Sequence, residues 1–231
     1  MSAIELSDLQ KRYGAVEAVR GVDLVVEPGE FVGLIGPNGA GKTTTLKMLT
    51  GQLLPTQGTV RVAGIDVVQN PGEAKRKLGY VPEEPALYEY LSAREFLEFV
   101  VSVRGEGSLE QALELTGLGA DADRLIREYS QGMRRKVALA AALVSEPPVL
   151  VLDEALNGLD PPSASRVKQA LRERCQSGAA VLLSTHVLET VERLADRVVM
   201  LAGGRVVANI PGEELEGCDL ESLFLEQIST D

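Results

Sequence analysis

The 231-residue sequence has no tryptophan, one histidine and two cysteines, Cys175 and Cys218. A single histidine cannot build the multi-histidine clusters of many metal enzymes. The cysteines are far apart and lack metal-ligand spacing, so we expect two reduced thiols in a reducing compartment. The segment Met1–Gln10 contains Glu5 and Asp8 and has none of the apolar core of a signal peptide, which predicts a cytosolic protein.

Long apolar runs and an excess of positive charge are also missing. The longest unbroken apolar run, Val137–Val144, has eight residues, whereas a helix that crosses a bilayer needs about 20. Lysine and arginine total 23 against 34 aspartate and glutamate residues, which gives a net charge of −11. This balance argues against nucleic acid as a partner, because a nucleic-acid-binding protein needs a basic face. Phosphate ligands stay compatible, since backbone N–H groups can bind them.

The composition is otherwise that of a globular protein. Hydrophobic residues make up 45% and charged residues 25%, which excludes wholesale disorder. The length fits one compact unit, so we expect residues 1–231 to form a single domain. Short β-rich runs at 4–6, 22–26 and 59–63, separated by proline and glycine turn signals, predict a β-rich N-terminal part.

Four runs of mainly apolar residues indicate strands that are buried on both faces. They lie at residues 31–35, 149–152, 179–183 and 197–201. Residues with helical apolar spacing separate the last three runs. This alternation of strand and helix predicts an α/β fold, with a mainly parallel sheet flanked by helices.

Residues 85–145 break the alternation and have a helical pattern. Ser92 and Glu95 form a capping box that predicts a helix start. Further helical stretches follow at 109–115 and 133–144, and a pair of prolines then ends the segment. We therefore predict an inserted helical subdomain at 85–145.

The core then comprises residues 1–84 and 146–210, on either side of the helical insertion. We predict a C-terminal helical tail at 211–231, because four apolar residues recur there at helical spacing. They are Leu220, Leu223, Phe224 and Ile228. Two interpretations stay open for this tail: it packs on its own domain, or it forms a dimer or partner surface.

A glycine-rich segment directly after the run at 31–35 carries the first chemical signal. It matches the pattern G-x-x-x-x-G-K-[ST] in full and opens a predicted helix at 42–50, which ends at Gly51. In such a loop the backbone N–H groups turn toward phosphate oxygens, a lysine reaches the β- and γ-phosphates, and a hydroxyl contacts Mg²⁺. We assign nucleotide contacts to Gly36, Pro37, Asn38, Gly39, Ala40, Gly41, Lys42, Thr43 and Thr44, with Lys42 also catalytic and Thr43 on the metal.

The acidic pair Asp153-Glu154 ends the apolar run at 149–152. Two adjacent carboxylates at the end of a buried strand are costly unless a cation compensates them. Neighbouring strand residues point in different directions, so we predict that Asp153 serves Mg²⁺ and that Glu154 polarises the attacking water. A simple acidic helix cap is the alternative, and the phosphate loop disfavours it.

With both motifs in this order, the chain resembles the nucleotide-binding subunit of ATP-binding cassette (ABC) transporters over nearly its whole length. The resemblance implies a P-loop NTPase fold of the ABC ATPase type, with an N-terminal antiparallel β subdomain and an inserted α-helical subdomain. Residues 129–133, Tyr-Ser-Gln-Gly-Met, stand where the family has its signature Leu-Ser-Gly-Gly-Gln. Ser130 and Gly132 are retained, and the resemblance implies that they bind the γ-phosphate held by another subunit; a capped helix start is the alternative.

Three further residues stand at motif positions of the family. Asp160 stands at the dimer-contact aspartate of the D-loop, although Ala155-Leu156 replaces the usual Pro-Thr. His186 follows the run at 179–183 and stands at the switch histidine that contacts the γ-phosphate. Tyr13 stands where the family stacks an aromatic ring on adenine, with an ordinary loop tyrosine as the alternative.

Residues 79–83 resemble the Q-loop of the family, but Glu83 replaces the usual glutamine. Both side chains offer an oxygen to Mg²⁺, so Glu83 is a predicted metal ligand, and its carboxylate adds negative charge near the triphosphate. The family docks a permease helix after this loop. Leu87, Tyr88 and Tyr90 are therefore assigned either to a docking groove or to ordinary packing.

The resemblance implies an ATPase that converts ATP and water to ADP and phosphate, with ATP and Mg²⁺ in its site. Two copies would close head-to-tail as a homodimer and drive a separate transmembrane permease, most like the ABC-2-type exporters of drugs, antibiotics or sodium. The chain would be cytoplasmic, held peripherally on the inner face of the cell membrane through the permease. The alternative is a soluble ABC ATPase that serves as an assembly or regulatory module.

Overall fold

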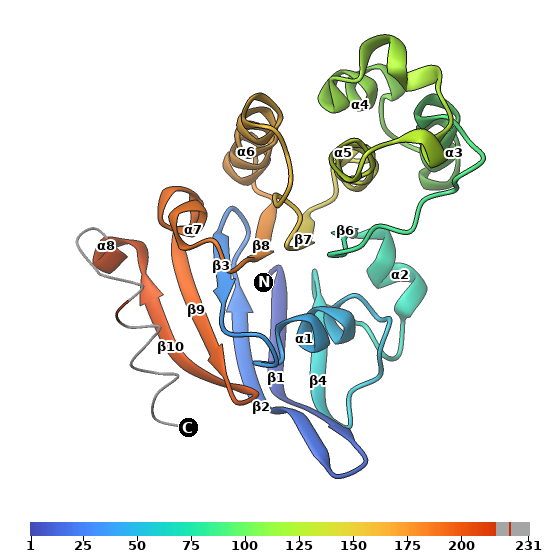
Figure 1. Ribbon diagram of the computed structural model, residues 1–231. Helices are drawn as coiled ribbons and strands as arrows, with labels where there is room; N and C mark the ends of the chain where they lie inside the picture. Colours follow the sequence, from blue (N-terminus) through green and yellow to red (C-terminus); the bar gives the residue numbers. More distant parts are fainter. Residues whose placement is uncertain (216–221, 223–231) are drawn as a thin grey trace.

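The computed structural model describes residues 1–215 and 222, and its largest element is a six-stranded sheet (Figure 1). All neighbouring strands of this sheet are parallel, except that β10 is antiparallel to β9. In spatial order the strands are β10 (Arg205–Pro211), β9 (Arg197–Ala202), β3 (Phe31–Ile35), β8 (Ala180–Ser184), β7 (Val149–Asp153) and β6 (Leu78–Val81).

The four apolar runs are confirmed as β3, β7, β8 and β9, and the sequence missed only the two outer strands of this sheet. β6 has four residues, one of them a glycine. A Cβ atom on Gly79 would lie 2.3 Å from the carbonyl oxygen of Ala142. The helix that contains Ala142 approaches this strand so closely that only glycine fits at position 79. β10 is an edge strand of mostly exposed or half-buried residues, and it therefore lacks a continuous apolar signal.

The second sheet is antiparallel and has the order β2-β1-β4-β5. Its strands are β1 (Ile4–Tyr13), β2 (Val16–Val26), β4 (Gln57–Val62) and β5 (Ile65–Asp66). The three short runs predicted here are confirmed as strands, but β1 and β2 extend well beyond them. The added residues form a largely polar hairpin that projects from the bottom of the molecule in Figure 1. Strand residues that face solvent can be polar, so the extended part of this hairpin has no continuous apolar pattern in the sequence.

Helices cover both faces of the six-stranded sheet. They are α6 (Pro161–Gln176) and α7 (Leu188–Leu194) on one face, and α1 (Lys42–Leu49) on the other, with the short α2 (Pro71–Arg76) beside β6. Side chains alternate along β3, so that Phe31 and Ile35 join the apolar cluster of α6 and α7, whereas Val32 and Leu34 join the cluster of α1. The antiparallel sheet packs against the cluster of α1 and so covers it on the side away from the six-stranded sheet. β3 is therefore buried on both faces, as its sequence predicts.

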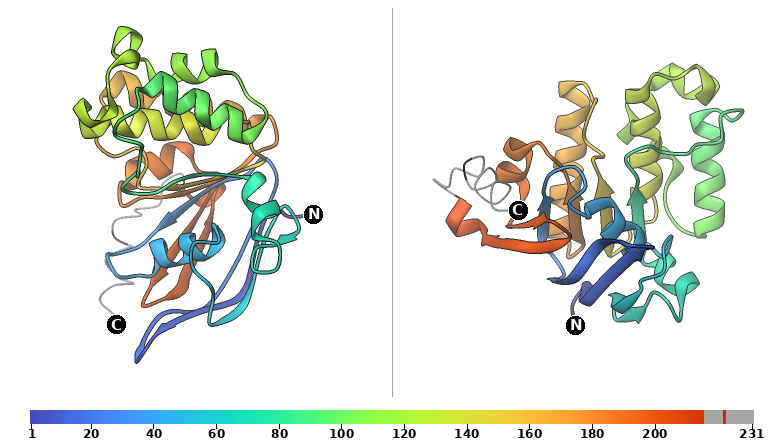
Figure 2. Two further views of the ribbon diagram at one scale, coloured as in Figure 1. Left: turned by 90° about the vertical axis from the view of Figure 1, so that its right-hand side faces the viewer. Right: turned by 60° about the horizontal axis from the view of Figure 1, so that its bottom comes forward.

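Residues 93–143 contain three helices joined by short 3-10 turns, and they lie away from the β1–β2 hairpin at the other end of the molecule (Figure 2). The elements are α3 (Ala93–Arg104), α4 (Leu109–Thr116), η1 (Gly119–Asp123), η2 (Ile126–Glu128) and α5 (Gln131–Leu143). The capping box is confirmed, because Glu95 N–H donates to Ser92 Oγ at 3.2 Å and Ser92 N–H donates to the Glu95 carboxylate at 2.8 Å. α5 packs on both sides, with Val137 in the helical cluster and Leu139 against the six-stranded sheet. We propose that residues 85–145 form a unit that α5 joins to the core.

The chain continues after β10 into the short helix α8 (Gly212–Leu215). All four apolar residues on which the predicted tail depends lie outside the described residues. β10 runs through Pro211, so the segment proposed as a helical tail begins within a strand. In the part of the chain that the structure describes, no helix has the length and apolar character needed to cross a bilayer.

Candidate nucleotide-binding and hydrolysis site

Four strands of the parallel sheet end at one edge, and the loops that follow them meet there. Loops at the carboxyl ends of parallel strands are the usual place for ligand binding in α/β folds. The loops after β3, β6, β7 and β8 together line a pocket of about 390 Å³. Its lining residues are Gly36, Pro37, Asn38, Lys42, Thr43, Glu83, Asp153, Glu154 and His186.

A second pocket, of about 250 Å³, adjoins the first along the glycine-rich loop. It is lined by Ala18, Pro37, Asn38, Gly39, Ala40, Gly41, Lys42, Thr43 and Thr44. The two pockets share four loop residues, so they form one continuous hollow around the start of α1. All nine loop residues predicted to contact nucleotide line at least one of them.

Two glycines of this loop are required by close backbone contacts. Gly41 precedes α1 with a φ of 100°, and a Cβ atom there would lie 2.6 Å from the carbonyl oxygen of Ala18. A Cβ atom on Gly36 would lie 2.2 Å from the carbonyl oxygen of Leu201. Only glycine fits both positions, and the bend that results places the free N–H groups of the first turn of α1 at the pocket.

Lys42 is buried at the base of the loop. Its ammonium group donates to the carbonyl oxygens of Gly36, at 2.6 Å, and of Pro37, at 3.1 Å. Burial lowers the pKa of Lys42, and the carboxylates of Glu154, Asp153 and Glu83 oppose this shift. The side chain thus closes the loop on itself and brings a cation to the three carboxylates of the pocket.

Asp153 is only 1% exposed, yet neither of its carboxylate oxygens has a hydrogen-bond partner among the described residues. Burial raises the pKa of Asp153, and the hydroxyls of Thr43 and Ser184 act against this shift without reaching hydrogen-bond geometry. A buried carboxylate without partners is costly unless a cation is present. Its two free oxygens and the Thr43 hydroxyl are hard donors of the kind that Mg²⁺ prefers, so these residues fit the ion.

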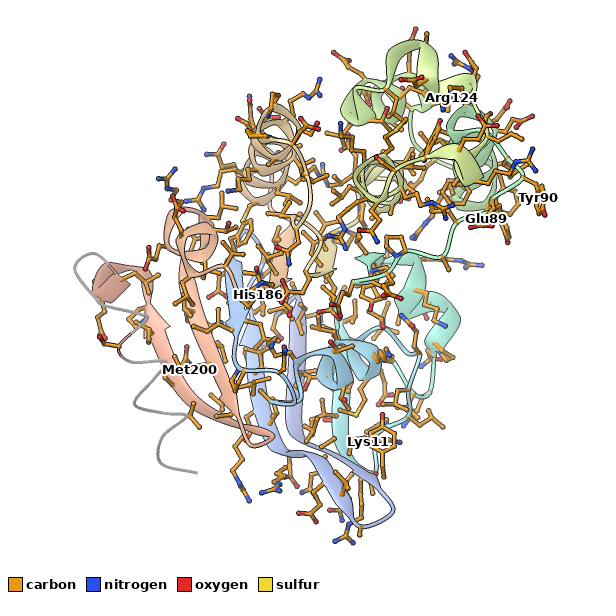
Figure 3. The ribbon with its side chains drawn as sticks, viewed as in Figure 1. Lys11, Glu89, Tyr90, Arg124, His186 and Met200 are labelled. Atoms are coloured by element: carbon orange, nitrogen blue, oxygen red, sulfur yellow. The ribbon has the colours of Figure 1, made fainter. Side chains whose placement is uncertain are left out.

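Glu154 is held in a defined orientation by three contacts. Its N–H donates to the carbonyl oxygen of Ser184 at 2.9 Å. One carboxylate oxygen accepts a hydrogen bond from Asn157 Nδ2 at 2.7 Å, and the other lies 3.0 Å from His186 Nδ1. The residue has a positive φ of 50°, a backbone conformation that non-glycine residues adopt rarely and that clusters at functional sites. Figure 3 shows His186 near the centre of the molecule.

Three predicted site residues lie outside this pocket, on the helical side of the molecule. Ser130 caps α5 by accepting a hydrogen bond from Met133 N–H at 3.3 Å, and Gly132 lies in the first turn of the same helix. Asp160 caps α6 through Ser163 and forms an ion pair with Lys136 at 2.7 Å. Hydrogen bonds from these partners, the Lys136 ammonium first, hold the pKa of Asp160 well below its usual range. One chain alone therefore does not bring these three residues to its own nucleotide pocket.

Tyr13 is the fourth predicted residue that the pocket does not include. It ends β1 on the projecting hairpin and is 49% exposed. The ammonium group of Lys11 lies 5.3 Å from the centre of its ring, and Figure 3 shows Lys11 far from His186. One face of the ring therefore contacts a cation, while about half of the residue stays exposed.

Asn157 is a site residue that the sequence analysis missed. Its side chain is one of the two that contact the Glu154 carboxylate. An amide three residues after a carboxylate can reach it in a tight turn, but the sequence motif alone does not establish that turn.

The sequence between residues 19 and 157 matches the family model described as ABC transporter. The chain belongs to the ABC transporter family. It is 36% identical to the bacitracin transport ATP-binding protein BcrA of Enterococcus faecalis, over 92% of this chain and 70% of that protein. It is 40% identical to the daunorubicin/doxorubicin resistance ATP-binding protein DrrA of Streptomyces peucetius, over 93% of this chain and 67% of that protein.

Solved structures of ABC ATPases share the same fold. An ATP-binding subunit of an ABC transporter superposes with a TM-score of 0.91 and 34% identity, covering 97% of this chain and 99% of the other. A dimeric ATP-binding cassette in a post-hydrolysis state, bound to ADP and Pi, has a TM-score of 0.84 and 25% identity, covering 90% and 98%. The fold predicted from the sequence is confirmed. As an ABC ATPase, the chain binds ATP and couples its hydrolysis to transport.

Proposed function

We propose that this chain is the ATP-hydrolysing subunit of an ABC-2-type exporter and works with a separate membrane permease. The single observation that carries the catalytic part is the 390 Å³ pocket, in which the phosphate loop, two buried carboxylates and a histidine meet. Relatives named for bacitracin transport, daunorubicin resistance and Nod factor export support the direction of transport. The chain would lie on the cytoplasmic side, held at the membrane through the permease.

ATP would bind with its phosphates in the hollow around the start of α1. The N–H groups of the loop and the ammonium group of Lys42 would contact the β- and γ-phosphates. Lys42 now donates to two carbonyl oxygens of the loop and would exchange some of these contacts for phosphate oxygens. Tyr13 would stack on adenine, which requires the hairpin to reach the same nucleotide.

Thr43 and Asp153 would hold Mg²⁺, with Glu83 as an additional oxygen ligand. The ion would neutralise charge on the phosphates during phosphoryl transfer. In the described part of the chain, no group of three or more histidine, cysteine or acidic side chains is arranged to hold a metal by itself. This fits Mg²⁺, which is typically bound by one or two carboxylates together with substrate phosphates.

Hydrolysis would be started by Glu154, whose carboxylate accepts a proton from the attacking water. Asn157 and His186 fix this carboxylate from two sides and leave it little freedom to turn. His186 is exposed at the mouth of the pocket, with 65% of its side chain accessible, so it has room to turn toward a γ-phosphate. The proton would leave with the phosphate product, and ADP would follow.

Two copies would pair head-to-tail to complete each site. Ser130 and Gly132 lie at the N-terminal end of α5, where N–H groups and the helix dipole attract anions. These residues and Asp160 do not line the pocket of their own chain, so a second molecule would have to bring them to the γ-phosphate. The dimeric cassettes among the solved relatives support this arrangement.

The surface after Glu83 is our proposed contact with the permease, and its three residues divide between two roles. Leu87 is partly buried and packs into the apolar clusters of the core. Tyr88 and Tyr90 are 57% and 78% exposed, and Figure 3 shows Tyr90 at the outer margin of the helical part. Both tyrosines thus have the exposure that a docking surface needs, although the Tyr88 ring also packs edge-on against Phe96 and Phe99. Leu87 has a packing role.

Replacing Glu83 with glutamine is expected to leave basal ATP hydrolysis comparable or to raise it up to about threefold, because one negative charge is removed near the triphosphate. Steady-state phosphate release from the purified protein measures the effect. Glu84→Gln is the matched control, since Glu84 is the next residue and does not line the nucleotide pocket. Complete loss of turnover in Glu83→Gln alone would contradict the view that either side chain can supply the oxygen ligand at this position.

Affinity capture of the tagged chain from solubilised membranes tests the transport role. We expect a multispanning membrane protein in stoichiometric amount, because the described chain has no helix that spans a bilayer. Substitution of both Tyr88 and Tyr90 by serine should reduce its recovery and leave basal ATPase activity unchanged. Recovery of a soluble scaffold in place of a membrane protein would favour the alternative of an assembly or regulatory ATPase.

A further inference from the structure

Arg135 on α5 connects three segments that are distant in the sequence. One of its guanidinium NH2 groups donates to the carbonyl oxygen of Asn157, in the loop after β7. The other donates to the carbonyl oxygen of Glu83, in the loop after β6. The guanidinium group is planar and holds its donors in a fixed fork, so the two bonds constrain both loops relative to the helix.

The contact with Asn157 leads directly to the catalytic carboxylate. The side chain of Asn157 donates to the Glu154 carboxylate at 2.7 Å, and its N–H donates to the carbonyl oxygen of Glu154 at 3.2 Å. Glu154 is in turn 3.0 Å from His186 Nδ1. Only one residue therefore separates Arg135 from the group that would polarise the attacking water.

The neighbours of Arg135 on α5 make a different kind of contact. Arg134 forms an ion pair with Glu89 at 2.9 Å, and Lys136 forms one with Asp160 at 2.7 Å. Among the described residues, Arg135 has no ion pair, and both of its hydrogen bonds go to backbone carbonyls. Its contacts therefore depend on the course of the two loops and not on the presence of a particular side chain.

We propose that Arg135 is a positioning residue for ATP hydrolysis, which makes the orientation of Glu154 depend on the position of α5. The same helix begins at Ser130, the residue that would meet the nucleotide of a partner subunit. Through Arg135, a shift of α5 would move Asn157 and with it the carboxylate, while the second bond carries the shift to the loop of Glu83. This inference rests on the proposed role of Glu154.

Arg135→Lys is the first test, because lysine keeps the charge but cannot reach two carbonyl oxygens with a rigid fork. We expect kcat to fall about tenfold, since small errors in the placement of catalytic groups are costly. KM for ATP, the affinity for a non-hydrolysable ATP analogue and the thermal midpoint should stay close to the wild-type values. Arg134→Lys is the matched control on the same helix, and its kcat should not change.

Arg135→Gln supplies a second variant, which also leaves one carbonyl without a donor and should give the same split between kcat and KM. A wild-type kcat in Arg135→Lys, or a loss that appears in analogue affinity or in the thermal midpoint in place of kcat, overturns the proposal. Glu154→Gln is measured in parallel. Normal turnover in Glu154→Gln would refute the proposed function itself, whereas an inactive Glu154→Gln beside a normal Arg135→Lys would refute only the positioning role.

A double variant tests whether the effect passes through Asn157. Residues that act along one path show non-additive losses, whereas independent residues lose activity multiplicatively. We therefore expect Arg135→Lys combined with Asn157→Ala to lose no more kcat than the more damaged of the two single variants. A combined loss equal to the product of the single losses would show that Arg135 acts by another route.

Discussion

Replacing Lys42 with alanine is expected to weaken ATP binding by about 10- to 100-fold and to abolish measurable hydrolysis. A hydrogen bond to a charged group contributes about 1.5–3 kcal/mol, and about 1.4 kcal/mol corresponds to a factor of ten. Lys42 also donates to the carbonyl oxygens of Gly36 and Pro37, so its loss removes the contacts that close the loop. Titration with a fluorescent ATP analogue and an assay of phosphate release measure the two effects.

Lys47→Ala is the matched control for this experiment. Lys47 lies on the same helix as Lys42, in its last turn, and its side chain is exposed. The control should bind ATP like the wild type and keep a similar thermal midpoint. If Lys42→Ala also bound and hydrolysed ATP normally, the hollow around the start of α1 would not be the phosphate site.

Replacing Glu154 with glutamine is expected to lower turnover by about a thousandfold, because general base catalysis typically contributes about 10²- to 10⁴-fold. The substitution preserves the local structure. The glutamine oxygen can accept the bond from Asn157 Nδ2, and the amide nitrogen can donate to His186 Nδ1. Only the ability to take a proton is lost, so ATP should still bind.

The bound and uncleaved ATP should also hold two copies of Glu154→Gln together. Light scattering on a size-exclusion column with saturating Mg-ATP measures this, and we expect a dimer that disappears when ATP is removed. Glu110→Gln, on an exposed position of α4, is the control and should hydrolyse ATP normally. A variant that stays monomeric with saturating Mg-ATP would count against the head-to-tail scheme.

The elements that the sequence predicted correctly are those whose signal lies in contiguous residues. The apolar runs of β3, β7, β8 and β9 indicate strands that are buried on both faces, and the capping box of α3 indicates where that helix starts. The glycine-rich loop also has a contiguous motif, but two of its glycines are required by backbone contacts with Ala18 and Leu201, which are distant in the sequence. Weakly apolar strands such as β10, and the polar part of the β1–β2 hairpin, have no such local signal.

The arrangement around Glu154, the proposed catalytic residue, depends instead on contacts that the tertiary structure creates. Glu154 and His186 are 32 residues apart, and they meet because β7 and β8 are parallel neighbours. Asn157 reaches Glu154 only because the chain turns sharply after β7. No periodicity or motif spacing in the sequence records these distances.

Local sequence was thus sufficient to identify the phosphate loop, the acidic pair and the family resemblance, because backbone conformation within a few residues follows from the side chains of those residues. Packing in three dimensions decided which carboxylate oxygens stay without partners, how Glu154 is held, and where Arg135 donates. These outcomes depend on strand order and on the close approach of α5 to β6, where a glycine leaves room for the helix. Such contacts join residues far apart in the chain, so only the folded molecule contains them.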